Sequence, residues 1–371
     1  MFKIIKKSKK TNSRLGVLAT SSGRVDTPFF MPIATKAAIK SLTVAEVKDL
    51  GAQIILSNTY HNYLRPGVST IKKFGGLHQF MNCDLPILTD SGGYQVFSLS
   101  NLRKIKGNNI EFRSHIDGSL QILNPKKVID IQGALGSDIM MVLDECVGLP
   151  TTKKKAQEAL ERTHRWAKMS IDYKKKLGLK SVKIRKQLLF GIVQGADFKD
   201  LRLQSAQYLG GLDFDGLAVG GLAVGESTKT MYEVLKYTVP ALPENKPHYL
   251  MGVGYPENII AAVKYGIDMF DCVIPTREAR HGKLYIANGK LLMASGQVNY
   301  KTISITNAKF AKDKSPINKD HPLLKQYSKA YLHHLFKTQE PLALRLATLN
   351  NLKFYLDLMK EIRRAIKVGK L

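Results

Sequence analysis

A chain of 371 residues, 44% hydrophobic and 23% charged, suits one globular barrel-type domain with an appendage, and no apolar run in it approaches the roughly 20 residues of a membrane span. Its 57 basic and 30 acidic side chains leave a net charge of +27, which indicates either solvated lysine-rich surfaces or a polyanionic partner. Three scattered cysteines without a C-x-x-C pair exclude a cysteine-rich metal site and argue against a disulfide framework, which suits a cytoplasmic protein.

Short apolar runs alternate with helix-like stretches along most of the chain. Each run is apolar throughout rather than alternating, which is typical of strands buried on both faces of a parallel sheet. The eight runs cover residues 29–34, 53–58, 86–90, 138–145, 188–195, 216–221, 249–254 and 269–275. Eight buried strands that alternate with helices predict an α/β fold, a (β/α)8 barrel, with a doubly wound open sheet as the alternative.

Helix start and stop signals lie between these runs. Thr43 and Glu46 form a T-x-x-E capping box, and Gly51 ends that helix. Apolar residues at helical spacing predict a helix over 152–171. A further helix is expected over 256–266, because a proline opens it and a glycine closes it.

Three regions depart from the alternation. The N-terminal segment and residues 101–123 are predicted to add β-hairpins, the second with a turn at Asp117-Gly118. After the barrel, which we assign to 1–281, the chain changes character. Residues 282–371 are expected to form a C-terminal subdomain that begins with a hairpin turning at Asn288-Gly289 and ends in helices.

The ends of the runs carry chemistry-bearing residues, and barrels of this type hold their active sites at the C-terminal ends of the strands. The runs end at Asn58, Asp90, Asp144, Gln194, Gly220–Gly221, Met251 and Asp271. We therefore expect three carboxylates, two amides and a glycine backbone to surround the C-terminal end of the barrel, which we call its mouth. An aspartate after a strand often caps the next helix, and Asp144 by itself is open to that interpretation.

Asp90 lies in TDSGGYQ, where Gly92 and Gly93 allow the backbone to approach a flat ligand and Tyr94 offers an aromatic face. Asp90 and Asp271 together form the kind of carboxylate pair that works at an anomeric carbon, with one nucleophile and one acid or base. The pair predicts displacement at a sugar carbon.

The remaining residues suit the edge of a guanine. Asp144 can accept from its N1 and exocyclic amine, whereas the Gln194 amide or the Gly221 N–H can donate to its carbonyl oxygen. The residues alone thus indicate a sugar carbon that bears a polar planar group, and they leave nucleosides and glycosides both open as substrates.

Several longer motifs extend this interpretation. They are LSNTYHNYLRPG, LTDSGGYQVFSLS, MMVLDEC, FGIVQG, GLAVGGLAVGE, YLMGVGYPE and MFDCVIPTREARHGK, followed by YSKAYLHHL. In this order and spacing the chain resembles the bacterial tRNA-guanine transglycosylases over nearly its whole length. The resemblance implies an enzyme of queuosine biosynthesis, a homodimer, that exchanges the wobble guanine of tRNAs with a G-U-N anticodon for 7-aminomethyl-7-deazaguanine.

Individual roles follow from the same resemblance. Asp271 matches the nucleophile that forms a covalent bond to the ribose, and Asp90 matches the general base. The base-binding set implied is Asp90, Ser91, Gly92, Gly93, Tyr94, Asp144, Gln194 and Gly221. The tRNA-contacting set implied is Gly252, Val253, Gly254, Tyr255, Pro256, Glu257, Asn258, Thr276, Arg277, Glu278, Ala279 and Arg280. Val224 is bulkier than its counterpart in queuine-using enzymes, which favours the smaller aminomethyl base.

One departure from the family pattern is large. The family holds a structural zinc near its C-terminus with three cysteines and a histidine, whereas this chain aligns Lys319, His321, Leu324 and Asn350 with those positions. We therefore expect no metal and no cofactor, with apolar contacts of residues 316–324, both prolines included, in place of zinc. Adjacent His333 and His334 suit packing or a dimer contact.

Two other functions stay open at this point. A glycoside hydrolase on the same barrel would use Asp90 and Asp271 as its pair, although the basic charge argues against it. A non-catalytic tRNA-binding protein would explain the loss of zinc, although the three aspartates would then have no reason to be kept.

Overall fold

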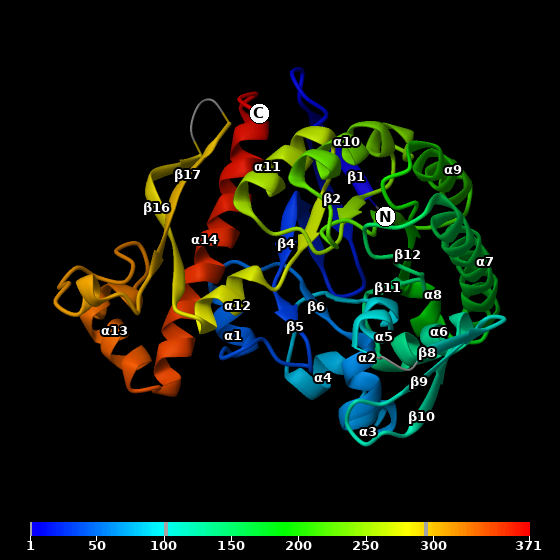
Figure 1. Ribbon diagram of the computed structural model, residues 1–371, viewed down its shortest axis with the longest axis horizontal. Coiled ribbons are helices and arrows are strands. Elements are labelled where there is room, and N and C mark those ends of the chain that lie inside the picture. Colours follow the sequence, from blue (N-terminus) through cyan, green and yellow to red (C-terminus); the bar gives the residue numbers. More distant parts are fainter. Residues whose placement is uncertain (1, 100–102, 293–295) are drawn as a thin grey trace.

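A sheet of parallel strands closes on itself at the centre of the computed structural model, which describes residues 2–99, 103–292 and 296–371 (Figure 1). In sheet order the strands are β4 (Phe29–Met31), β15 (Met269–Asp271), β14 (His248–Leu250), β13 (Gly216–Val219), β12 (Leu188–Val193), β11 (Ile139–Met141), β7 (Ile87–Thr89), β6 (Ile55–Ser57) and β5 (Ile33–Ala34). Only Pro32 separates β4 from β5; the two strands pair with opposite ends of the sheet and so close the barrel. The predicted (β/α)8 barrel is confirmed.

Every predicted apolar run overlaps a barrel strand, although β14 begins one residue before its run, and nearly all strand residues are buried. The strands are shorter than the runs. The run over 138–145 leaves the sheet after Met141, and the run over 269–275 leaves it after Asp271 and enters a helix at Ile274. Asp144 therefore lies on a loop beyond its strand, whereas Asp271 is the last residue of its strand.

Helices surround the sheet. They are α1 (Val44–Asp49), α2 (Thr59–Asn62), α3 (Val68–Lys73), α4 (Leu77–Met81), α5 (Gly93–Leu99), α6 (Pro125–Leu135), α7 (Lys153–Gly178), α8 (Val182–Lys186), α9 (Lys199–Gly210), α10 (Thr228–Thr238), α11 (Pro256–Tyr265) and α12 (Ile274–Arg280). Both halves of the capping box at Thr43 and Glu46 are present. Thr152 caps α7, and Gly266 ends α11 with a φ of 103°. All three predicted helices are confirmed.

The insertion after the third barrel strand is larger than the predicted hairpin. It is a three-stranded antiparallel sheet of β8 (Arg103–Lys106), β9 (Asn109–Arg113) and β10 (Leu120–Leu123), seen at the lower right of Figure 1. The predicted Asp117-Gly118 turn joins β9 to β10, and a second turn at Gly107 was not predicted. Residues 101 and 102 of the prediction lie outside the described chain.

The N-terminal segment forms a similar sheet of β1 (Phe2–Lys7), β2 (Arg14–Ala19) and β3 (Arg24–Thr27). At the other end of the chain, β16 (Lys283–Leu292) pairs with β17 (Val298–Ser304). The turn predicted at Asn288-Gly289 is wrong, because both residues lie within β16 where its register with β17 shifts. Gly289 has a φ of 82°, and a bulge uses this conformation as readily as a turn does.

Two helices complete the C-terminal region, α13 (Lys329–Lys337) and α14 (Pro341–Lys367). The first half of α14 packs in an apolar cluster with α13, and its second half packs against the barrel strand β4, where the rings of Phe30 and Tyr355 lie 5.1 Å apart. This one helix therefore joins both parts of the chain (Figure 1). A boundary at residue 281 stays a prediction. No helix of the described chain is long and apolar enough to cross a membrane.

Candidate active site

Asp90 follows β7, and three donors hold its carboxylate. The side chains of Asn58 and Gln95 donate to Oδ2, and the backbone N–H of Thr59 donates to Oδ1 at 2.8 Å. Burial raises the pKa of Asp90 to about 6, with the nearby Asp271 carboxylate contributing in the same direction and the three donors opposing it. Asp90 is therefore fixed in orientation and able to exchange a proton near neutral pH.

Asp271 is held differently. The Tyr249 hydroxyl donates to its Oδ1 at 2.6 Å and the Gly252 N–H donates to the same oxygen at 2.9 Å. No described residue donates a hydrogen bond to Oδ2. Burial raises the pKa of this carboxyl too. One oxygen thus anchors the side chain while the other keeps its lone pairs, which is what a nucleophile requires.

Asp144 lies beside them and binds Gln194. The Gln194 Nε2 donates to Asp144 Oδ2 at 2.7 Å, and the Ser91 hydroxyl donates to Oδ1 at 3.3 Å. Burial raises the pKa of Asp144 to about 6, and the charge of Asp90 adds to the shift. The Gln194 Oε1 is buried with no protein partner. This pair therefore presents acceptor and donor atoms side by side, as recognition of a base edge demands.

Glycines allow these groups to lie so close. A Cβ on Gly93 would lie 2.8 Å from the Asp144 carbonyl oxygen, and one on Gly221 would lie 2.4 Å from Gln194 Oε1. Gly92 and Gly221 have φ values of 78° and 65°, which side chains rarely adopt. Tyr94, at the start of α5, keeps 53% of its surface exposed, so its ring is free to stack on a ligand.

The predicted base-binding residues are thus brought together at one mouth. The segments predicted to contact tRNA flank it, since Gly252 binds Asp271 and α12 follows β15. Their exposed side chains are those of Tyr255, Glu257 and Arg277. Other members of this set are buried: Val253, Gly254, Pro256, Asn258, Thr276 and Ala279. Buried members can only shape the segment or contribute backbone atoms.

Some residues of the site were not assigned from sequence. Gln95 and Tyr249 bind the two carboxylates, and their motifs gave no sign of it because one lies in a helix and the other in a buried strand. Lys36 and Lys40 are exposed after β5 at the same end of the barrel. Arg202 was also missed, although a basic residue on the buried face of α9 is a signal that could have been read.

The region aligned with the family zinc site does not fit a metal. Leu324 is fully buried in an apolar cluster, and His321 Nδ1 accepts the N–H groups of Leu323 and Leu324. The buried Asn350 amide donates to the Tyr285 carbonyl at 3.0 Å and accepts from Asn318 at 3.1 Å.

Among the described residues, no group of three or more histidine, cysteine or acidic side chains could hold a metal ion. The apolar packing predicted for this segment is found for Ile317 and Leu324, which are buried in the cluster, and for Leu323, which packs against it. Pro316 is only half-buried, and the packing predicted for Pro322 is wrong, because Pro322 is exposed. His333 is buried and bonds to the Ile305 carbonyl, so it serves packing, whereas His334 is exposed.

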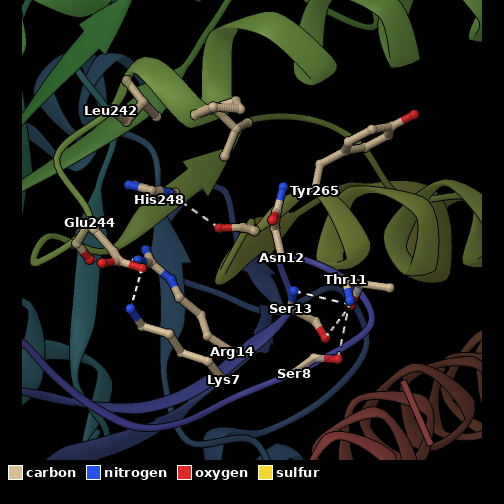
Figure 2. A pocket seen from close by; sticks show the side chains of 13 residues that line it. Lys7, Ser8, Thr11, Asn12, Ser13, Arg14, Leu242, Glu244, His248 and Tyr265 are labelled. Carbon is tan, nitrogen blue, oxygen red and sulfur yellow. Dashed lines mark hydrogen bonds and ion pairs between the residues drawn. The ribbon is translucent and has the colours of Figure 1, made fainter.

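A cavity of about 410 Å³ lies at the opposite end of the barrel, where β14 begins (Figure 2). Its charged groups are paired with one another or with backbone: Lys7 reaches Glu244 at 2.5 Å, and both ring nitrogens of His248 face carbonyl oxygens. Arg14 forms a buried ion pair with Asp268 at 2.6 Å. These interactions stabilise the floor of the barrel and occupy the charged side chains that line this cavity.

Comparisons with known proteins identify the family of this chain. A family model described as queuine tRNA-ribosyltransferase matches residues 9–371. Proteins named queuine tRNA-ribosyltransferase from Thermoanaerobacter sp. (strain X514) and Dictyoglomus turgidum are 50% and 48% identical to this chain; each alignment covers 100% of the chain, and 94% and 92% of the two relatives. One from Staphylococcus haemolyticus is 48% identical over 99% of the chain and 92% of its own length. The chain therefore belongs to the queuine tRNA-ribosyltransferase family, whose members are tRNA-guanine transglycosylase enzymes.

Proposed function

We propose that this enzyme replaces the wobble guanine of tRNAs with a G-U-N anticodon by 7-aminomethyl-7-deazaguanine, through a covalent ester on Asp271. The observation that carries the proposal is the unequal anchoring of two neighbouring carboxylates. Asp271 keeps Oδ2 free of donors among the described residues, whereas Asp90 has both oxygens bound. A free oxygen suits attack, and a fixed carboxylate suits proton transfer.

The reaction then has two halves. Oδ2 of Asp271 attacks C1′ of the ribose and forms a C–O bond as the bond from C1′ to N9 of guanine breaks. Guanine takes a proton from solvent as it leaves, and the Asp90 carboxylate, with a pKa of about 6, takes a proton from N9 of the incoming base and returns it to solvent. That base attacks C1′ and releases Asp271, so each half is one displacement and protons balance over the cycle.

Base recognition is assigned to the remaining polar groups. Asp144 accepts from N1 and the exocyclic amine, and the Gln194 amide and Gly221 N–H serve the carbonyl oxygen. Val224 follows Gly221 by three residues, and Glu226 binds its N–H at 3.0 Å; its branched side chain favours the aminomethyl base over the larger queuine. A homodimer in the cytoplasm completes the proposal, and sedimentation of purified protein tests the dimer.

Incorporation of radiolabelled guanine into tRNA tests the function directly. We expect label in tRNAs whose anticodon loop carries guanine between two uracils, and its release when 7-aminomethyl-7-deazaguanine is added. A matched tRNA in which adenine replaces that guanine should take up none. Absence of exchange by folded protein, or equal exchange into both tRNAs, contradicts the proposal.

Exchange should also depend on pH in a defined window. Burial raises the carboxyl pKa of Asp90 and Asp144 from 3.8 to about 6, and both act as carboxylates. Below pH 6 they gain protons, so kcat/KM should fall about tenfold per pH unit for one group and up to about a hundredfold for two. Above pH 7 the rate should level off.

This profile is measured between pH 4.5 and 8, with each sample returned to pH 7.5 to show that lost activity is regained. A rate constant that stays level from pH 7 down to pH 5 would contradict the raised pKa values.

We further propose that the enzyme folds and works without zinc. Structural zinc supplies folding energy through thiolate and imidazole ligands, and here Leu324 and the Asn318–Asn350 amide pair take their place. Activity should survive exhaustive chelation. Asn350→Ala should lower the free energy of unfolding by about 1–3 kcal/mol, because it leaves the buried Tyr285 carbonyl without its donor.

Elemental analysis and denaturant titration provide these measurements. Asn318→Ala is the matched control, because it removes the less buried partner of the same amide pair. It should lower the free energy of unfolding by less than Asn350→Ala does. One zinc bound per chain, or activity lost to chelator and restored by zinc, would overturn the idea.

A further inference from the structure

A buried cation lies beneath the base-recognition groups. Arg202 on α9 has no exposed surface, and all its recorded hydrogen bonds run to backbone carbonyls. Nε donates to Ala196 at 2.7 Å, Nη1 to Val193 at 3.1 Å and to Gly220 at 2.7 Å, and Nη2 to Gly221 at 3.2 Å. The guanidinium therefore clamps the ends of β12 and β13, from which Gln194 and Gly221 project.

The buried guanidinium of Arg202 carries a positive charge. No ion pair of Arg202 is found among the described residues, and the ionisable groups that act on it from farther away are Tyr237, Cys146, Glu226 and Asp197. Burial lowers the pKa of Arg202 to about 10, so the group remains a cation at pH 7. A buried charge without a counter-ion is costly, and a simple clamp would not need one.

The Arg202 guanidinium lies next to the peptide group that joins Gly220 to Gly221. The Gly220 carbonyl and the Gly221 N–H belong to the same peptide unit. A cationic donor 2.7 Å from that carbonyl oxygen polarises the unit and makes its N–H a stronger donor. The bond from Nη2 to the Gly221 carbonyl holds the next peptide as well, so the N–H is fixed in direction.

We propose that Arg202 is a positioning residue that acts through the Gly220–Gly221 peptide to strengthen the Gly221 N–H as a donor to the carbonyl oxygen of the bound base. This deepens the proposed function and rests on its assignment of Gly221 to base recognition. The effect grows as the base leaves, because the negative charge formed at N9 spreads onto that oxygen. Arg202 thus favours bases with a carbonyl at this position and assists their departure without touching them.

Two bases that differ in one atom isolate the effect. Guanine and 6-thioguanine share the N1–H and the exocyclic amine, but sulfur is a poor acceptor. Dissociation constants of both are measured by calorimetry for the unaltered enzyme and for Arg202→Lys and Arg202→Gln. Both variants keep a donor for the backbone carbonyls, and only the lysine variant keeps the charge.

The preference for guanine over 6-thioguanine should fall roughly three- to tenfold in Arg202→Gln, because a charge-assisted hydrogen bond is about twice as strong as a neutral one. In Arg202→Lys, which keeps the charge, the preference should stay within about twofold of that of the unaltered enzyme. Arg363→Gln is the matched control, because this half-buried arginine donates to the Pro28 carbonyl away from the mouth, and it should leave the preference unchanged.

The outcomes separate the two proposals. If the unaltered enzyme shows no preference for guanine, or does not exchange it into tRNA, the proposed base recognition fails. Suppose that the unaltered enzyme prefers guanine and exchanges it into tRNA. If Arg202→Gln then lowers the affinity for guanine and for 6-thioguanine by the same factor, Arg202 is only structural and the inference is overturned. An equal change of preference in the lysine and glutamine variants also overturns it.

Discussion

Asp271→Asn is expected to abolish guanine exchange, with a loss of kcat of roughly a thousandfold or more, as is found when a covalent nucleophile is removed. A neutral amide is a poor nucleophile, because its nitrogen lone pair is delocalised into the carbonyl group and its oxygen carries no full negative charge, so no ester to C1′ can form. The fold should not suffer, because both recorded hydrogen bonds to this carboxylate reach the same oxygen. The amide oxygen that the substitution introduces can accept from Tyr249 and Gly252 in place of that carboxylate oxygen.

The test combines activity with trapping. Enzyme and tRNA are mixed, denatured and separated on a gel, and the unaltered protein should carry tRNA while Asp271→Asn carries none. Tyr249→Phe is the matched control, since it removes one donor to Oδ1 and keeps the nucleophile, so an adduct should still form. Near-normal turnover by Asp271→Asn would show that another group attacks.

The parts of this site that the sequence predicted share one physical cause. Parallel strands buried on both faces are continuously apolar, so their ends are visible as the first polar residues after each run. Asp90, Gln194 and Asp271 were located in this way, and the closed barrel brought them together. The family resemblance then supplied roles that spacing alone had left open between nucleoside and glycoside chemistry.

What the sequence did not predict depends on contacts between distant segments. Asn288-Gly289 suits a turn or a bulge, and only pairing with β17 decides between them. Tyr249 looks like any buried strand residue until its hydroxyl is seen to meet Asp271. Arg202 shows the same limit: its helical position predicts burial of a cation, but not the peptide that the cation serves.

The zinc region illustrates a different limit. Loss of the cysteines was plain from the sequence, and burial of Leu324 followed from its apolar character. The amide pair of Asn318 and Asn350 did not follow, because Asn350 had been compared with a lost metal ligand rather than with a hydrogen-bonding partner. Contacts of this kind, between segments far apart in the sequence, become visible only in three dimensions.

Binding of tRNA should weaken steeply with salt. Arg277 is exposed beside the mouth and Arg280 is half-buried there. Lys36 and Lys40 are exposed after β5, at the same end of the barrel. If six or more such groups meet phosphates, affinity should fall about a thousandfold between 50 and 200 mM salt, since each contact releases a counter-ion.

Single substitutions resolve this footprint. Arg277→Ala should reduce the slope of log K against log salt by about 0.7 to 0.9, the value of one phosphate contact, with the loss of affinity largest at low salt. Lys7→Ala is the matched control, because Lys7 is exposed at the opposite end of the barrel and paired with Glu244. Its slope should equal that of the unaltered enzyme. A flat salt dependence, or equal effects of the two substitutions, would show that tRNA does not lie across the mouth and that the net charge of +27 serves solvation instead.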